Sequence, residues 1–261
     1  MNIKEFTTVS IDEQKDRMVV ALMRPAVRNA IDQKMVDELH EICRHLEQSP
    51  KILIITGMTG KQAPDGEAVF ASGADIGELR NRRRESGLLG INAMLFHRLA
   101  LLPLPVIAAI DGFALGGGAE LAYAADFRIG TPHVKLGNPE PGLGIMAAAG
   151  GTWRLAELVG EPLAKEILLA GRVLSGEECH EVRLINDLVA SEELMPRAHE
   201  WADRISRSDP FAVRVTKAVF RMPRESHPEV DTLAQALLFE SEQKFERMDA
   251  FLARRSSSFP S

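Results

Sequence analysis

A run of three glycines, residues 116–118, stands between a strand-length apolar run, Val106–Ile110, and an apolar segment of helical length, residues 119–125. Glycine lets the backbone adopt angles that other residues avoid, so the chain can turn sharply from a strand into a helix here. A helix that is apolar on all sides has to be buried. The sequence therefore predicts a buried strand–turn–helix unit near its centre.

Short apolar runs alternate with helical patterns through the first half of the chain. Asp32 is a suitable N-cap for a helix whose apolar residues recur at helical spacing until Pro50 ends it. A further helical segment is expected from about Ile76. Strands are predicted at 18–23, 52–56, Val69–Ala71, Val106–Ile110 and 127–129, with an exposed loop over 57–66. Strands that alternate with helices in this way are typical of an α/β domain.

The last part of the chain differs from the rest. From about Glu192 no strand pattern is present, and helical patterns cover 194–205, Pro210–Phe220 and 233–252. We therefore predict an α/β core over residues 1–191 and a helical region over residues 192–261. Helical tails with apolar faces often pack on another subunit, and the residue pattern by itself leaves open whether this one does.

Composition is that of a soluble globular protein, with 45% hydrophobic and 26% charged residues. The net charge of -6 and the pI of about 5.7 disfavour general binding to nucleic acid or to an anionic membrane, because both attract basic surfaces. The longest apolar run, 99–110, is interrupted by Pro103 and Pro105 and is too short to span a bilayer. The polar start and the two cysteines without motif spacing predict a cytoplasmic location.

The glycine run also offers backbone groups that can take part in binding and catalysis. The first amides of a helix have no partner within the helix, and with the helix dipole they can hold a developing negative charge. Such amides can form half of an oxyanion hole. The alternative is a turn kept tight for packing alone. The segment is not a phosphate loop, because no Lys-Ser/Thr follows, and it lacks the spacing of a dinucleotide fingerprint.

Three acidic residues have notable surroundings. Glu120 lies in the first turn of the apolar helix, where it either complements the helix dipole or is a buried carboxylate that must be paired, neutral or functional. Glu140 lies in the turn-rich segment 137–144, and by itself it reads most simply as a surface loop residue. Asp75 follows a small-residue turn and by itself reads as a helix cap.

Other polar residues are less informative. His97, His133 and His180 show no metal-ligand spacing, so no metal site is predicted. The arginine run within 80–84 reads as a solvated helix face, with binding of ligand phosphates as the alternative.

Taken in order, these segments resemble the motifs of the crotonase (enoyl-CoA hydratase/isomerase) family. The turn 72–75 is similar to the family's Ala-Gly-Ala-Asp, and 116–120 is similar to its Gly-Gly-Gly-x-Glu. Residues 139–144 and 150–152 match the Pro-Glu-x-x-Leu-Gly and Gly-Gly-Thr that follow. The early stretch 24–30 resembles Arg-Pro-x-x-x-Asn-Ala, so the similarity extends along nearly the whole chain.

The resemblance implies a fold of repeated ββα units in a spiral, with a C-terminal helical region that forms trimers, often paired into hexamers. It implies an acyl-CoA thioester as substrate, with coenzyme A as part of that substrate and with no cofactor or metal. Neither nucleic acid nor membrane is an expected partner.

The resemblance also assigns roles to individual residues. The backbone amides of Ser72 and Gly117 would bind the thioester carbonyl oxygen, and Glu120 and Glu140 would share the proton transfers. Further contacts with the substrate are expected from Arg28, Ala74, Asp75 and Ile76.

The presence of both glutamates favours a hydratase, because isomerases of the family commonly work with a single acid. The alternatives are a double-bond isomerase, another CoA-thioester enzyme of this fold, or a non-catalytic member that binds an acyl-CoA, a partner or RNA. The chain departs from the family pattern at Pro141, at 146–148 and in a longer loop over 60–67. These departures concern substrate choice more than the fold.

Overall fold

The computed structural model describes residues 6–57 and 66–258 of the chain. The chain divides into two compact units, Met1–Asp203 and Arg204–Ser261, and each is described by itself. Most of the loop predicted over 57–66 lies outside the described residues. Within the described residues, no helix is long and apolar enough to cross a membrane.

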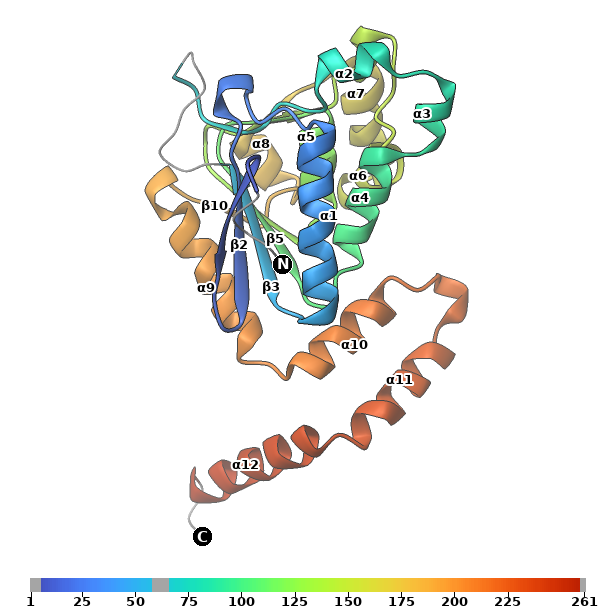
Figure 1. The fold of residues 1–261 in the computed structure, drawn as a ribbon. Helices are drawn as coiled ribbons and strands as arrows, with labels where there is room; N and C mark the ends of the chain where they lie inside the picture. Colours follow the sequence, from blue (N-terminus) through green and yellow to red (C-terminus); the bar gives the residue numbers. More distant parts are fainter. Residues whose placement is uncertain (1–5, 58–65, 259–261) are drawn as a thin grey trace. The chain divides into compact units, whose positions relative to one another are not determined.

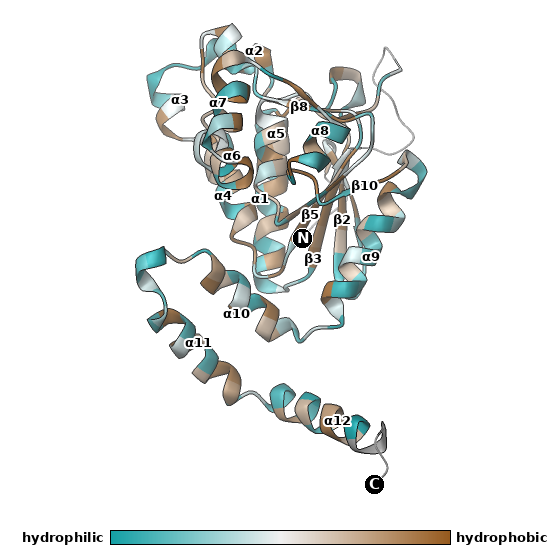
Figure 2. Cartoon of the chain, turned by 180° about the vertical axis from the view of Figure 1, so that it is seen from behind, coloured by the Kyte–Doolittle hydropathy of each residue, from teal (hydrophilic) through white to brown (hydrophobic). Residues whose placement is uncertain are grey.

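The first unit is built on a six-stranded sheet (Figure 1). Its strand order is β1 (Val9–Glu13), β2 (Arg17–Leu22), β3 (Ile52–Gly57), β5 (Val106–Ile110), β7 (Phe127–Gly130) and β10 (Asp187–Leu188). The β1–β2 pair is antiparallel and the other pairs are parallel. Every residue of β3 and β5 is buried, as is usual for parallel strands covered on both faces, and both strands appear strongly hydrophobic in Figure 2.

A second sheet has four strands, and its order reveals the repeat of the fold. Its strands are β4 (Val69–Ala71), β6 (Phe113–Leu115), β8 (Lys135–Gly137) and β9 (Leu174–Ser175). The pairs β3 and β4, β5 and β6, and β7 and β8 each place one strand in each sheet, and helical segments follow each pair. This succession of ββα units confirms the predicted spiral.

Nine α-helices accompany the two sheets within the described residues up to Ser206. They are α1 (Gln33–Gln48), α2 (Ile76–Asn81), α3 (Arg84–Leu88), α4 (Ile91–Ala100), α5 (Gly117–Tyr123), α6 (Gly151–Val159), α7 (Glu161–Ala170), α8 (Gly176–Glu181) and α9 (Leu194–Ser206). Asp32 caps α1 as predicted, because its side chain accepts a hydrogen bond from the Met35 amide at 2.8 Å. Figure 1 shows α1 beside α4 on one face of the sheet and α9 on the other. On that second face, Trp201 packs against Phe127 with ring centroids 4.8 Å apart.

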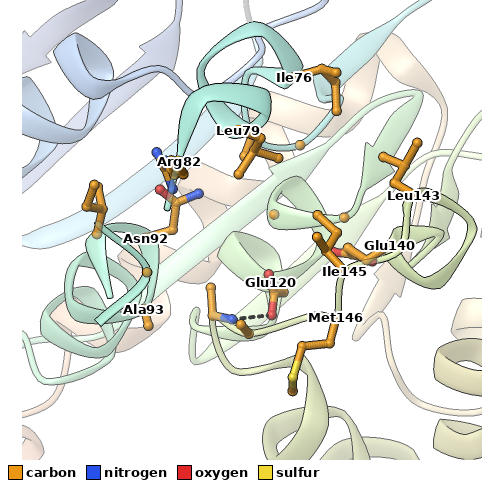
Figure 3. Close-up of a pocket in the computed structure, with 18 of the residues that line it drawn as sticks. Ile76, Leu79, Arg82, Asn92, Ala93, Glu120, Glu140, Leu143, Ile145 and Met146 are labelled. Atoms are coloured by element: carbon orange, nitrogen blue, oxygen red, sulfur yellow. Dashed lines mark hydrogen bonds between the residues drawn. The ribbon is translucent and has the colours of Figure 1, made fainter. Parts of the chain in front are cut away.

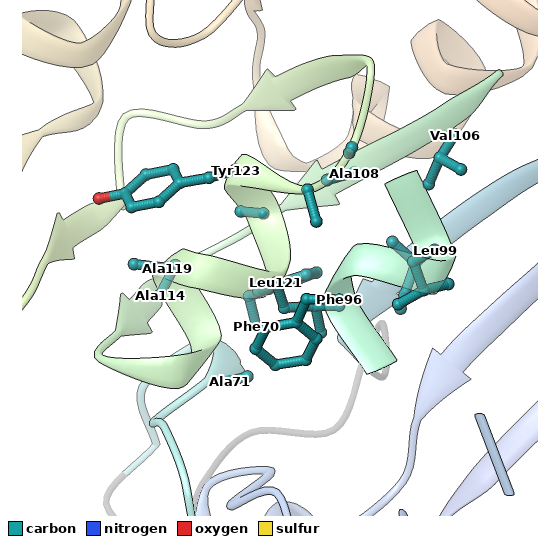
Figure 4. Close-up of a cluster of buried hydrophobic side chains, with 14 of the residues drawn as sticks. Phe70, Ala71, Phe96, Leu99, Val106, Ala108, Ala114, Ala119, Leu121 and Tyr123 are labelled. Atoms are coloured by element: carbon teal, nitrogen blue, oxygen red, sulfur yellow. The ribbon is translucent and has the colours of Figure 1, made fainter. Parts of the chain in front are cut away.

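Helix α5 is buried in the first unit, as the sequence predicted. All seven of its residues are buried. Figure 4 shows Leu121 packed against Phe70 of β4 and Phe96 of α4. A Cβ on Gly118 would stand 2.1 Å from the carbonyl oxygen of Ala71, so the backbone of α5 lies directly against the end of β4.

The second unit contains only helices within its described part. They are α10 (Pro210–Phe220), α11 (Glu229–Phe239) and α12 (Glu242–Ser258), and a short 3-10 turn at Arg224–Ser226 lies between α10 and α11. The prediction of one helix over 233–252 was wrong. The chain breaks at Ser241, whose hydroxyl accepts from the Lys244 amide at 3.3 Å and starts a new helix. Serine competes for backbone hydrogen bonds in this way and therefore favours helix ends.

The close approach at Gly118 predicts a stability effect. Gly118→Ala should destabilise the protein by about 1–3 kcal/mol, because the new methyl group would overlap the backbone of β4. Gly87→Ala is the matched control: this glycine lies in α3 and a Cβ there meets nothing within 4 Å. The control should be neutral or gain up to about 1 kcal/mol, since alanine is the better helix former. Urea unfolding of both variants measures the difference, and equal stabilities would contradict the close contact.

Candidate active site

A cavity of about 490 Å³ opens between α5 and the segments on either side of it. Its walls come from the turn after β4, from α2, α3 and the start of α4, from the turn before α5, and from residues 139–149. Figure 3 shows Glu120 and Glu140 facing this cavity. The two glutamates that the sequence singled out therefore share one site.

Two turns meet at the inner wall of the cavity, and both need glycine. Gly73 has φ +112° and a Cβ there would lie 3.1 Å from the carbonyl oxygen of Leu115. Gly116 has φ +52° and a Cβ there would lie 3.1 Å from Oε1 of Glu140. L-residues with side chains rarely adopt such angles, so glycine is what allows the two backbones to approach. Residues of both turns thereby line the cavity.

The free amides in these turns differ in part from the prediction. The Ser72 amide, predicted as an oxyanion donor, donates to the carbonyl oxygen of Arg28 at 3.0 Å. The N–H of Ile31 donates to the carbonyl oxygen of Gly73, and the carbonyl oxygen of Ile31 accepts from the Asp75 amide. These two bonds flank Ala74, so the Ala74 amide points away from Ile31.

Ala74 and Gly117 are the residues whose amides remain available. Neither N–H donates to an acceptor within the described residues, and both residues line the cavity. Ala74 N lies 3.3 Å from the position that a Cβ on Gly117 would occupy, so the two turns hold these amides close together. A pair of fixed donors of this kind suits the binding of a carbonyl oxygen.

Glu120 is buried and firmly held. It lies in the first turn of α5 with 3% of its surface exposed. Its Oε1 accepts hydrogen bonds from the amides of Ala149 at 2.6 Å and Gly151 at 2.9 Å. The pKa of Glu120 is raised to about 7, mainly because the carboxyl group is buried. The two amides oppose this rise in the pKa, and the nearby Glu140 carboxylate adds to it.

Glu140 is buried as well, although the sequence around it suggested a surface loop. It begins a 3-10 helix, Glu140–Leu143, and is 8% exposed. Oε1 lies 3.4 Å from Nδ2 of Asn138, whose Oδ1 accepts from the Tyr123 hydroxyl at 3.0 Å. Oε2 is enclosed and has no hydrogen-bond partner within the described residues. Burial is the main cause that raises the pKa of Glu140 above its ordinary value.

The other predicted contact residues fall into two groups. Ala74 and Ile76 line the cavity. Asp75 instead caps α2 by accepting from the amides of Gly77 and Glu78, and it pairs with Arg24 at 3.7 Å. Arg28 has an exposed side chain and is not part of the cavity wall. Neither Asp75 nor Arg28 is therefore positioned by this structure to touch a ligand in the cavity.

The structure decides between the two interpretations of the arginine run and adds one cavity residue that the sequence did not single out. Arg82 and Arg83 line the cavity, which favours ligand binding over the solvated face as the interpretation of the arginine run. Asn92, in the first turn of α4, also lines it and is buried. The arginine run in the sequence was the signal for Arg82 and Arg83. No motif marks Asn92.

Comparison with known proteins agrees with this fold and site. The model of a family described as enoyl-CoA hydratase/isomerase matches residues 12–261. The chain is 34% identical to a crotonyl-CoA hydratase of Syntrophomonas wolfei, over 97% of this chain and 98% of that protein. It is 36% identical to a short-chain-enoyl-CoA hydratase of Clostridium acetobutylicum, over 91% and 88% of the two chains.

Solved structures show the same likeness. The crystal structure of an enoyl-CoA hydratase from Bacillus anthracis superimposes with a TM-score of 0.87 at 30% identity, covering 95% of this chain and 97% of that one. The fold is thus the crotonase fold, which confirms the predicted class. The chain belongs to the enoyl-CoA hydratase/isomerase family.

The raised pKa of Glu120 makes stability depend on pH. The folded protein binds this proton more tightly than the unfolded chain, in which the pKa of the glutamate is 4.5. The contribution of this proton to the stability of the fold is therefore complete below pH 4.5 and is lost as pH rises through about 7. Relative to Glu120→Gln, the wild type should lose up to about 3 kcal/mol between pH 4.5 and 8. Denaturant unfolding of both proteins across this range measures the difference.

A control for this pH dependence is Glu161→Gln. Glu161 is exposed, and its hydrogen bond with Lys165 lowers its pKa, so this variant should show a small difference of the opposite sign. A gap between the wild type and Glu120→Gln that stays constant with pH would contradict the burial argument.

Proposed function

We propose that this protein is an enoyl-CoA hydratase that adds water across the double bond of a trans-2-enoyl-CoA. The observation that carries the proposal is the pair of buried carboxylates, Glu120 and Glu140, in one cavity with the free amides of Ala74 and Gly117. The hydratases named above, similar over most of their length, support the same activity.

The amides act on the thioester carbonyl oxygen. When water attacks Cβ of the enoyl group, electrons move toward that oxygen and an enolate develops. Two fixed N–H donors, from Ala74 and Gly117, stabilise this negative charge, and such a donor typically contributes about 2.7–4 kcal/mol. The helix dipole at the start of α5 acts in the same direction.

The two glutamates divide the proton transfers. Burial raises both pKa values, and mutual repulsion disfavours two negative charges, so a state with one ionised and one protonated carboxyl group is expected near neutral pH. The ionised carboxylate takes a proton from water as its oxygen bonds to Cβ. The protonated one delivers a proton to Cα. Water is consumed and both protons are accounted for.

The two acids differ in which of their carboxylate oxygens have hydrogen-bond partners. Oε1 of Glu120 is occupied by the amides of Ala149 and Gly151, so Oε2 is the oxygen that can bind water. Oε2 of Glu140 is enclosed and unpartnered, so no described protein group competes for a proton on this carboxyl group. We therefore assign water binding chiefly to Glu120 and proton delivery to Glu140, held by Asn138.

The walls of the cavity fit the two ends of an acyl-CoA. Leu143, Ile145 and Met146 present exposed apolar side chains to the cavity and suit the acyl group. Arg82 and Arg83 provide positive charge for the phosphates of coenzyme A. The proposed chemistry uses only protein groups and water, so it needs neither a metal nor a further cofactor. The predicted cytoplasmic location stays a prediction.

We also propose that the chain forms trimers, or hexamers from paired trimers, through residues 204–261. Large apolar side chains on these helices are exposed in the single chain; among them Phe220 is 86% exposed and Leu233 is 70% exposed. Burial of such side chains against other copies would remove them from water. Sedimentation equilibrium should give three or six times the chain mass of 28.7 kDa, and a monomer would contradict this proposal.

A double-bond isomerase is the second candidate. The unpartnered Oε2 of Glu140 favours it, because one carboxylate that moves a proton between two carbons suffices for isomerisation. Hydration of crotonyl-CoA without conversion of a 3-enoyl-CoA would support the hydratase. The reverse result would support the isomerase.

Substitution of each glutamate tests the proposed division of labour. Glu120→Gln and Glu140→Gln should each lower kcat for crotonyl-CoA hydration by about 10²–10⁴-fold, because each removes one proton-transfer group. The loss of absorbance at the enoyl-thioester band measures the rate. Absence of wild-type activity over several acyl lengths would refute the hydratase, and a loss confined to one variant would indicate a mechanism with one acid.

A further inference from the structure

Asn92 presents a buried carboxamide to the cavity without a protein partner. The residue is 9% exposed and lies in the first turn of α4. Its Oδ1 is enclosed and accepts no hydrogen bond, and no residue in the described part of the chain bonds to its Nδ2. A buried polar group without a partner destabilises a fold, so a protein that keeps one at a ligand site gains something else from it.

The carboxamide lies beside the two available amides. Nδ2 of Asn92 is 3.6 Å from the position that a Cβ on Gly117 would occupy, and Ala74 N is 3.3 Å from the same position. The amide nitrogen of Gly117 is bonded to the Cα that would carry this Cβ. Three N–H donors from α4, from the turn after β4 and from the start of α5 therefore border one small volume. In Figure 3 the side chain of Asn92 extends from α4 into the cavity.

We propose that Asn92 is a third hydrogen-bond donor to the thioester carbonyl oxygen, an inference that rests on the proposed hydratase function. Nδ2 donates to the oxygen that Ala74 and Gly117 also bind. The bond strengthens as the enolate forms, because the oxygen then carries more negative charge. An uncharged amide suits this position, since a buried cation would cost more to desolvate.

The test begins with Asn92→Leu, which keeps the branched shape and the number of side-chain heavy atoms and removes the donor. We expect kcat for crotonyl-CoA hydration to fall about 10–100-fold, somewhat less than the loss usually seen for a donor in a two-donor site. KM should change little, because the interaction is strongest in the transition state. The melting temperature should stay equal or rise by about 2–4 °C, since an unsatisfied buried amide is removed.

Two further variants separate the donor from its shape. Asn92→Asp keeps the size but replaces the donor with an acidic group beside the developing negative charge, so the loss of kcat should exceed that of Asn92→Leu. Asn81→Leu is the control: this asparagine lies on α2, is exposed and is not part of the cavity wall. It should keep the wild-type kcat.

A direct readout is the infrared stretch of the thioester carbonyl in bound butyryl-CoA labelled with ¹³C at that carbon. The shift to lower frequency should be smaller in Asn92→Leu than in the wild type, because one hydrogen bond is missing. A wild-type frequency in Asn92→Leu overturns the proposal, and so does an unchanged kcat. A lowered melting temperature with an unchanged frequency would assign Asn92 a structural role instead.

Failure of this inference is distinguishable from failure of the proposed function. If the wild type does not hydrate crotonyl-CoA, the hydratase proposal fails. The carbonyl frequency of bound butyryl-CoA still reports whether Asn92 bonds to the thioester oxygen, since that measurement requires no turnover.

Discussion

The backbone contact between two turns, one after β4 and one before α5, is the constraint on which the site depends. A side chain on Gly118 would overlap the backbone of Ala71, and side chains on Gly73 and Gly116 would be both strained by the positive φ angles and tightly packed. This contact places the amides of Ala74 and Gly117 together, and it fixes α5 against β4. Because α5 carries Glu120 in its first turn, the same contact also sets the position of one acid relative to the amides.

Burial then gives the site its electrostatic character. Glu120 and Glu140 come from different turns of the spiral but line one cavity, and both are buried, so charge on them is costly. The amides of Ala149 and Gly151 offset part of that cost for Glu120, and Asn138 offsets part of it for Glu140. The balance leaves the pKa of Glu120 at about 7 and that of Glu140 above its ordinary value, whereas a pair of solvated glutamates would both be ionised at neutral pH.

Much of the fold could be predicted, because its signals are local. The apolar helix with Glu120 in its first turn and the cap at Asp32 follow from neighbouring residues, and the structure has both. Features that depend on distant partners were missed. The Ser72 amide is occupied only because Arg28 lies beside it, and Glu140 is buried only because the segments around α5 enclose it. Asn92 carries no local signal, since its role depends on what lies across the cavity.

The wall formed by α2 and α3 has a consequence for how this enzyme can evolve. No residue of α2 or α3 is buried, yet Ile76, Leu79 and Ser86 from this stretch line the cavity. The proton-transfer groups and the free amide of α5 belong instead to the segments from β6 onward. Mutations in the wall can therefore reshape what the cavity admits while the reacting groups keep their positions. The part of the cavity that α2 and α3 form is thus encoded in a different stretch of the chain from the two acids, and selection can change that part without losing them.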